Sequence, residues 1–399
     1  MSSLFNTDPI VVVSTCRTAI GSFSGSLKDL KVSELGGIVV KNAVERAGLS
    51  PYDIDEVVMG CVGQIAEDTF LARLSSVKAG IPYESTALTV NRLCSSGLQA
   101  IVTAAQEISC GFCEVAVAGG AESMSNYPYY VRKARFGYRM GHGEFEDGLV
   151  TALTDPFSGK HMGITAENVA ARFHISREEQ DRLAVKSQQR AAGARESGKF
   201  VEEIVPVTVP DGKKNTKIFD VDEYIRPDVT METLGKLRPA FISDGTVTAG
   251  NSSGINDGAA AVVVMKESKA RALDIKPIAK IVSAQVAGVQ PEIMGIGPVA
   301  AVKKLYEATG MTKQDIGLFE LNEAFAAQAV ACIKELELDD AIVNVNGSGI
   351  SLGHPIGATG CVIAVKLLNE MRRRQVQYGI ASLCIGGGQG LAVLFELCA

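Results

Sequence analysis

Cys94 is the residue whose surroundings best suit nucleophilic chemistry. The stretch before it, 86–90, is β-branched and apolar, which favours a buried strand. Apolar residues then recur at helical spacing, so a helix is expected to begin at Ser95 or Ser96, both good N-cap types. Unpaired N–H groups and the helix dipole at such a helix start lower the pKa of a thiol and make it nucleophilic. This segment alone also fits a small, buried structural cysteine.

Three further segments place polar side chains beside turns. His354 lies in a run, 344–360, that holds five glycines, so backbone can approach a ligand closely and the imidazole stays accessible. It could instead cap the following helix. Cys384 ends an apolar strand before a glycine turn, which a phosphate loop and a plain turn would share. Asn322 and Glu323 lie where a strand gives way to an Ala-rich helix, and could form an N-cap.

Composition limits the function classes. With 39 basic and 45 acidic residues the net charge is −6, which gives no indication of nucleic-acid or anionic-membrane binding. The nine cysteines lack the spacing of a disulfide scaffold, which fits a reducing compartment. We interpret the Cys110–Cys113 pair as structural rather than as a redox site. Four histidines without ligand spacing predict no metal site. No signal peptide or membrane span is expected, so we predict a cytoplasmic location.

Short β-branched strands alternate with amphipathic helices along the chain. This alternation predicts α/β layers with largely parallel sheets. The expected helices are 32–47, 176–196 and 296–309. The expected strands are 10–13, 56–59, 114–118, 260–265, 279–284, 317–320, 341–345 and 380–385.

The two ends of the chain resemble each other in three places, in the same order. Segment 51–59 is echoed by 313–321, segment 91–97 by 346–360, and segment 115–120 by 381–387. Three ordered echoes predict a duplicated α/β unit. Between the halves, residues 123–253 are richer in charge and tyrosine, and we interpret them as an insertion that covers a ligand.

Four segments together resemble the signatures of the thiolase family, and the resemblance runs from Val11 to the C-terminus. They are 91–100, 322–326, 353–357 and 384–390. The resemblance implies a thiolase-like α/β fold in which duplicated halves form a layered α-β-α-β-α core with an inserted loop domain. The domains it implies are 1–122 plus 254–277 as the N-terminal half, 123–253 as the loop domain over the coenzyme A (CoA) site, and 278–399 as the C-terminal half.

The resemblance also implies a division of labour among the polar residues. Cys94 would attack an acyl-CoA thioester, and His354 would take the thiol proton and help form an oxyanion hole. Asn322 would orient a water that completes this hole. Cys384 would act as acid and base. The N–H groups of Cys94 and Gly386 would form a second oxyanion hole.

Six further residues are expected to bind substrate through the same resemblance. They are Leu153 and Arg226 at the nucleotide end of CoA, His161 and Ser253 along the pantetheine channel, and Met294 and Phe325 in the acyl pocket. No cofactor is expected, because CoA thioesters are substrates. Ser348 and Ser351 depart from the usual family pattern and place hydroxyls near the histidine loop.

His161 is typical of the family branch that makes acetoacetyl-CoA. The expected reaction is the reversible condensation of two acetyl-CoA to acetoacetyl-CoA and CoA, with a homotetramer formed through strand 86–90 and segment 127–138. Three alternatives stay open at this point. They are a degradative 3-ketoacyl-CoA thiolase of broader chain length, a condensing enzyme acting on acyl-carrier protein, and a non-catalytic lipid carrier of the same fold.

Overall fold

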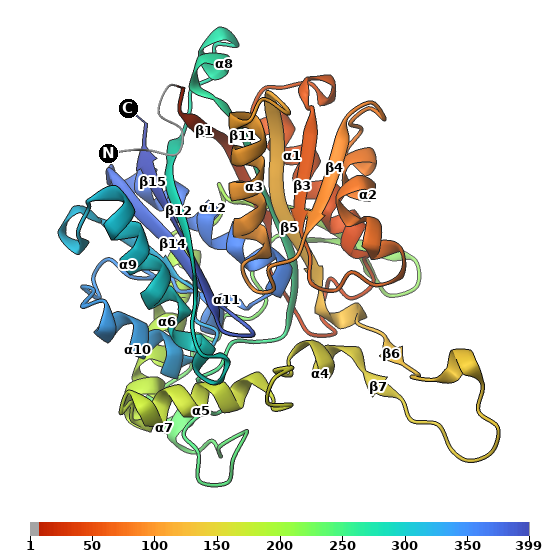
Figure 1. The fold of residues 1–399 in the computed structure, drawn as a ribbon, viewed down its shortest axis with the longest axis vertical. Helices are drawn as coiled ribbons and strands as arrows, with labels where there is room; N and C mark the ends of the chain where they lie inside the picture. The colour runs from red at the N-terminus through yellow and green to blue at the C-terminus, as the bar shows by residue number, and fades with distance from the viewer. Residues whose placement is uncertain (1–7, 399) are drawn as a thin grey trace.

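The computed structural model describes residues 8–398. Over this range, none of the helices is long and apolar enough to cross a membrane. Eleven of the described strands form one continuous mixed sheet made of two similar halves, with helices between and outside them, and the inserted segment adds two separate two-stranded sheets (Figure 1). The N-terminal half has the order β4 (Thr86–Val90), β3 (Glu56–Gly60), β5 (Val115–Ser123), β11 (Asn256–Lys266) and β1 (Ile10–Thr18).

The C-terminal half repeats this order. It consists of β13 (Leu318–Leu321), β14 (Tyr378–Ile385), β15 (Gln389–Leu397) and β12 (Ala279–Gly288). An isolated parallel bridge from Val343 to Phe319 occupies the place that β4 has in the first half. Strands β1 and β12 pair briefly and antiparallel, which joins the halves. The repeated order agrees with the predicted duplication, while the exact domain boundaries stay a prediction.

Six of the described helices build the layers around the sheet halves (Figure 1). Helices α1 (Val32–Arg46) and α2 (Leu71–Lys78) pack on the N-terminal half, and α9 (Gly297–Thr309) and α10 (Ala326–Glu335) belong to the C-terminal half. Helices α3 (Ser96–Ser109) and α12 (Ile356–Arg374) pack against each other between the halves. Helix α12 contacts strands of both halves and is buried on nearly every face, as a central helix must be.

The inserted segment carries most of the remaining elements. Its helices are α4 (Gly148–Ala152), α5 (Met162–Arg172), α6 (Arg177–Glu196) and α7 (Met231–Gly235), and its strands are β6 (Tyr129–Tyr130), β7 (Glu146–Asp147), β8 (Ile204–Val205), β9 (Val207–Asp211) and β10 (Asn215–Phe219). Of these strands, β9 pairs with β10 and β6 with β7 to form the two separate two-stranded sheets. Outside the inserted segment lie β2 (Gly21–Ser22), α8 (Glu267–Ala272), α11 (Gly349–Leu352) and short 3₁₀ turns at 51–53, 66–70, 291–296 and 313–315, while the turns at 124–126 and 134–136 lie within it. The segment between β6 and β7 extends away from the body as an arm (Figure 1).

Three expectations about the sheet are wrong. The sheet is not largely parallel, because among the described strands only the β3–β4, β3–β5, β13–β14 and short β1–β8 pairs run parallel. Strand β4 is not buried; it is the edge of the sheet, and Leu88 on it is 39% exposed. Segment 341–345 is not a strand, because the Asn344 side chain bonds both the N–H and the carbonyl of Leu321 and so replaces a strand's backbone. The three predicted helices agree with α1, α6 and α9 to within one residue at each end.

Glycines allow the N-terminal ends of α3 and α12 to meet at backbone distance. A Cβ at Gly97 would lie 2.7 Å from the Cys361 nitrogen, and one at Gly360 would lie 2.3 Å from the Leu98 nitrogen. Both distances are shorter than any real Cβ contact, so only glycine fits at either position. The two helix starts are therefore held side by side by the absence of side chains.

A buried carboxylate ties the same region together. Glu122, near the end of β5, accepts hydrogen bonds from the N–H groups of Val62 and Gly63, each at 2.9 Å, and from Gly357 at 2.8 Å in the first turn of α12. The Tyr127 hydroxyl donates a fourth at 3.1 Å. One side chain thus connects the N-terminal half of the fold to the start of the helix that belongs to the C-terminal half.

We expect the G360A variant to be destabilised by about 1–3 kcal/mol, because its Cβ would push α12 away from α3. The matched control is G193A in α6, where a Cβ meets nothing within 4 Å. That change should stabilise the protein by up to about 1 kcal/mol through helix propensity. Urea or thermal midpoints measure both. Equal midpoints for the two variants would contradict the close contact.

Candidate active site

A cavity of about 590 Å³ opens where α3 and α12 begin. It is lined by residues of both sheet halves and of the inserted segment. Nine of the eleven predicted site residues line it: Cys94, Leu153, His161, Arg226, Ser253, Met294, Phe325, His354 and Gly386. The other two lie directly behind the wall. Asn322 faces the His354 ring, and Cys384 belongs to the apolar cluster that contains Met294 and Phe325.

Cys94 sits on a tight turn between β4 and α3. Leu93 has a left-handed backbone with φ of 46°, and its N–H is bonded by the Asn91 side chain at 2.9 Å. The Ser96 hydroxyl accepts from the Arg92 N–H and donates to the Leu93 carbonyl. A strained conformation held by this many bonds places the thiol at the tip of the turn, facing the cavity.

The surroundings of Cys94 do not give the low pKa that the sequence suggested. Burial raises the pKa of Cys94 to about 11, and the Glu122 charge adds to this. The N–H groups of Gly386 and of Cys94 itself, which approach the sulphur, lower the pKa by less. Desolvation of a thiolate therefore outweighs the helix start. The thiol is protonated at neutral pH and needs a base.

His354 fits the requirements of that base. Burial lowers the pKa of His354 to about 4, so the ring is neutral at pH 7. Its Nδ1 lies 2.7 Å from the Thr359 hydroxyl, which donates its own proton to the Pro355 carbonyl at 2.9 Å. The hydroxyl can then only accept from Nδ1–H, because it has a single proton. This arrangement leaves the lone pair on Nε2, which is free to take a proton.

The backbone around His354 is fixed by a second asparagine. The His354 N–H donates to the Asn256 side chain at 3.0 Å, and Asn256 donates to the Gly21 carbonyl at 3.0 Å. The preceding Gly353 has φ of 110°, and a Cβ there would lie 2.4 Å from Asn256. Asn256 was not anticipated from the sequence, because β11 is distant along the chain from the histidine loop.

Asn322 lies behind the His354 ring, and one of its polar side-chain atoms is unpaired among the described residues. Its Nδ2 is 3.5 Å from each ring nitrogen of His354, and its backbone N–H donates to the Ser382 carbonyl at 3.0 Å. Its Oδ1 is buried and has no hydrogen-bond partner within residues 8–398. An unpaired buried amide oxygen is what a water-orienting residue would present. The water-orienting role stays a prediction.

Cys384 is buried at the end of β14, close to the nucleophile. Burial raises the pKa of Cys384 well above its usual value, and the nearby sulphurs of Cys94 and Cys332 add to the effect. The following turn has positive φ at Gly387 and Gly388, of 78° and 89°. This turn aims the Gly386 N–H back toward Cys94, as the second predicted oxyanion hole requires.

Aromatic stacking shapes the wall that the inserted segment contributes. His161 caps α5, accepting from the Gly163 N–H at 3.1 Å, and burial lowers its pKa. Its ring stacks on Phe241 with centroids 4.9 Å apart, and Phe241 meets Phe325 edge-on at 6.2 Å. Phe241 was missed in the sequence because it lies in a polar, irregular stretch. The one signal in the sequence was the glycine at position 163. In the structure this glycine makes room for the Phe241 ring, because a Cβ there would lie 2.3 Å from it.

The two unusual serines of the histidine loop do not line the cavity. Ser348 donates to the Leu321 carbonyl at 3.1 Å, and the Ser351 hydroxyl lies 2.9 Å from that of Ser187 on α6. Ser187 in turn donates to the buried Glu323 carboxylate at 2.6 Å. The serines therefore support the loop from beneath. Cys110 and Cys113 are free, and no cluster of three metal-binding side chains occurs within residues 8–398.

Comparison with known proteins places these features in a family. Residues 10–268 match the family model of the thiolase N-terminal domain, and residues 275–397 match that of the thiolase C-terminal domain. The chain is 53% identical to beta-ketothiolase BktB of Cupriavidus necator, with 98% of this chain and 99% of that protein covered. It is 50% identical to acetyl-CoA acetyltransferase of Chromobacterium violaceum, with 97% and 99% covered.

Solved structures give the same result at the level of the fold. The crystal structure of Bacillus anthracis acetyl-CoA acetyltransferase matches with a TM-score of 0.96 and 46% identity, covering 98% of this chain and 99% of that one. Human mitochondrial 3-ketoacyl-CoA thiolase matches with a TM-score of 0.95 and 44% identity over the same shares. The expected thiolase-like fold is thus confirmed. From its two family domains and its near full-length relatives, the chain belongs to the thiolase family of acyltransferases.

Proposed function

We propose that this protein is an acetyl-CoA C-acetyltransferase, which condenses two acetyl-CoA to acetoacetyl-CoA and CoA and also catalyses the reverse cleavage. The observation that carries the proposal is that Cys94 and His354 line one cavity and that Cys384 lies behind its wall, close to the Cys94 sulphur. The names of relatives such as acetyl-CoA acetyltransferase of Chromobacterium violaceum support the substrate class. The side chains of Met294, Phe325 and the stacked His161 line the cavity, and walls of this kind favour a small acyl group.

The geometry supports a two-stage reaction in which protons balance. Cys94 passes its proton to Nε2 of His354 as the sulphur attacks the thioester carbonyl of the first acetyl-CoA. The departing CoA thiolate takes a proton from Cys384, which leaves Cys384 as a thiolate while His354 is an imidazolium. Cys384 then removes the α-proton of the second acetyl-CoA, and the carbanion attacks acetyl-Cys94. The released Cys94 thiolate recovers its proton from His354.

A degradative enzyme of broader chain length is the second candidate. The similarity to BktB and to human mitochondrial 3-ketoacyl-CoA thiolase favours it. Thiolysis rates against acyl chain length separate the two candidates. We expect acetoacetyl-CoA to be cleaved fastest, together with a single acetyl adduct on Cys94 in the mass spectrum after mixing with acetyl-CoA. Faster cleavage of a medium- or long-chain 3-ketoacyl-CoA would overturn the choice, and absence of any adduct would favour a non-catalytic carrier.

Assembly and location also belong to this proposal. The edge strand β4 leaves one side of its backbone unpaired by the chain, and the arm between β6 and β7 exposes Tyr129, Phe136 and Met140. Unpaired edges and exposed apolar arms are features of subunit contacts. They support a homotetramer built as a dimer of dimers. Free cysteines throughout residues 8–398 support a cytoplasmic location.

Replacing Cys384 separates the two stages. The C384A variant should still form acetyl-Cys94, because Cys94 and His354 remain and a CoA thiolate can leave without a proton from Cys384. Condensation should fall by about 10²–10⁴-fold, because no other group takes the α-proton. The buried sulphur leaves little volume behind, and C332A, another buried cysteine change in the same half, serves as the control for packing. Turnover within a few fold of the unaltered protein would disprove the role of Cys384.

The pH dependence of acylation tests the base. With neutral His354 as acceptor, the acetyl-Cys94 rate should be flat from pH 6 to 8 and fall only as the ring protonates toward its pKa of about 4. In H354Q, reaction should depend on the thiolate of Cys94, whose pKa is about 11, so the rate should rise about tenfold per pH unit from pH 7 to 10. Rapid-quench mass spectrometry measures both profiles.

The hydroxyl that sets the histidine tautomer provides a matched pair of variants. T359S keeps the acceptor for Nδ1–H and should keep the acylation rate, whereas T359V removes it and should slow acylation about tenfold or more without moving the pH profile.

An H354Q profile as flat as that of the unaltered protein would refute the assignment of the base.

A further inference from the structure

A second cavity, of about 800 Å³, lies at the opposite end of α12 from the active site. It opens beside the seam where β1 pairs with β12, and its walls come from the ends of α1, α12 and β15 and from the segment before β12. Helix α12 spans Ile356–Arg374, so the two cavities are separated by roughly 28 Å of helix. No part of the reaction proposed above uses this second cavity.

The charge of this cavity is opposite to that of the whole protein. Arg46, Lys276, Arg372 and Arg373 line it, against a single carboxylate, that of Glu202. The chain as a whole carries a net charge of −6. In the active-site cavity, by comparison, Arg226 is the one lysine or arginine. A concentration of cations in a hollow of an acidic protein focuses a positive potential there.

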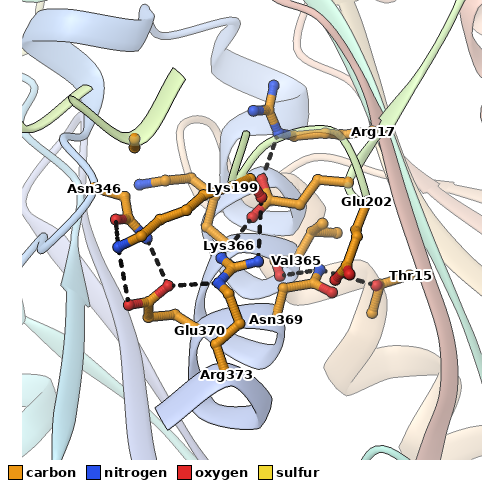
Figure 2. Close-up of polar contacts among 12 residues, drawn as sticks. Thr15, Arg17, Lys199, Glu202, Asn346, Val365, Lys366, Asn369, Glu370 and Arg373 are labelled. Atoms are coloured by element: carbon orange, nitrogen blue, oxygen red, sulfur yellow. Dashed lines mark hydrogen bonds and ion pairs between the residues drawn. The ribbon is translucent and has the colours of Figure 1, made fainter. Parts of the chain in front are cut away.

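Two of these cations are held in place by the fold. Arg46 donates to the carbonyls of Thr15, Glu202 and Ile204. Arg373 donates to Glu370 at 2.8 Å, to the Lys199 carbonyl at 3.1 Å and to Glu203 at 3.4 Å, in the last turns of α12 (Figure 2). Both residues end helices, where cations compensate the carbonyl dipoles. Both have a structural role and form a rigid floor of the cavity. Glu370 and Glu203 compensate the charge of Arg373, whereas Arg46 is bonded by neutral carbonyls and supplies positive charge.

The other two cations, Lys276 and Arg372, have no such structural role. Lys276 and Arg372 are exposed and form no hydrogen bond or ion pair through their side chains with any residue from 8 to 398. They face a hollow that also has an apolar wall, formed by Val13, Ile278 and Leu397. Unpaired cations beside an apolar surface suit a ligand with a charged group and a less polar body.

We propose that this cavity is a second ligand site that binds a small multivalent anion carrying phosphate or carboxylate groups. Lys276 and Arg372 would contact the charged groups directly, and Arg373 would contribute the N–H groups left free by its bonds to Glu370, Lys199 and Glu203. Guanidinium groups bind both oxyanions through paired hydrogen bonds, so the chemistry shared by the two ligand classes is a cluster of charged oxygens. The cavity volume lies in the range of small-molecule sites.

The test is a thermal-shift and calorimetric titration of the whole protein with inorganic pyrophosphate and, separately, with citrate. At least one of the two should raise the midpoint in a saturable manner, and which one does so identifies phosphate or carboxylate as the preferred group. The K276A/R372A double variant should weaken that binding at least tenfold. Because both side chains are exposed and unpaired, the variant should fold, and an unchanged midpoint without ligand checks this.

Two controls locate the binding. R182A/K303A removes the same charge from exposed positions outside both cavities and should bind as the unaltered protein does. R226A removes the cation of the active-site cavity and should also retain binding. Loss of binding in R226A but not in K276A/R372A would assign the anion to the active site and overturn the proposal. Absence of saturable binding of both probes below about 10 mM would overturn it as well.

Discussion

The close contact between the starts of α3 and α12 is the constraint on which the site depends. Cys94 and His354 are far apart in the sequence, and each stands two residues before one of these helices. Without side chains at Gly97 and Gly360, the two helix ends approach until backbone meets backbone. Cys94 and His354, the proposed nucleophile and base, then face one cavity, and the Glu122 carboxylate holds the surrounding N–H groups in place.

Duplication explains why the chemistry divides as it does. Both halves have the same strand order, and in each the central helix follows a residue that lines the cavity, Cys94 in one and His354 in the other. Glu122 and Cys384 are likewise each the last residue but one of a corresponding strand, β5 and β14. One copy of this position became a structural anchor with four hydrogen bonds, and the other holds a thiol beside the reacting sulphur.

Much of this was predictable from local patterns. The helix after Cys94, the glycine turn after Cys384 and the repeated order of elements each have signals within a short window of sequence. What could not be predicted depends on distant partners. The exposed edge position of β4, the replacement of a strand at 341–345 by one asparagine, and the stacking of Phe241 on His161 all follow from how the halves and the insertion pack. The pKa of Cys94 was misjudged for the same reason, because burial is a property of the folded molecule.

Burial also determines how the reaction must proceed. It raises the pKa of Cys94 to about 11 and lowers that of His354 to about 4, so a free thiolate–imidazolium pair is unfavourable in the resting protein. Transfer of the proton from Cys94 to His354 therefore becomes favourable only together with attack on a bound thioester. In that step the negative charge moves from sulphur to the carbonyl oxygen, which hydrogen-bond donors stabilise. A neutral histidine, held in the correct tautomer by Thr359, then lowers the barrier to attack more than a permanently ionised thiol would. The same low-polarity surroundings that suppress the thiolate at rest strengthen those donors during the reaction.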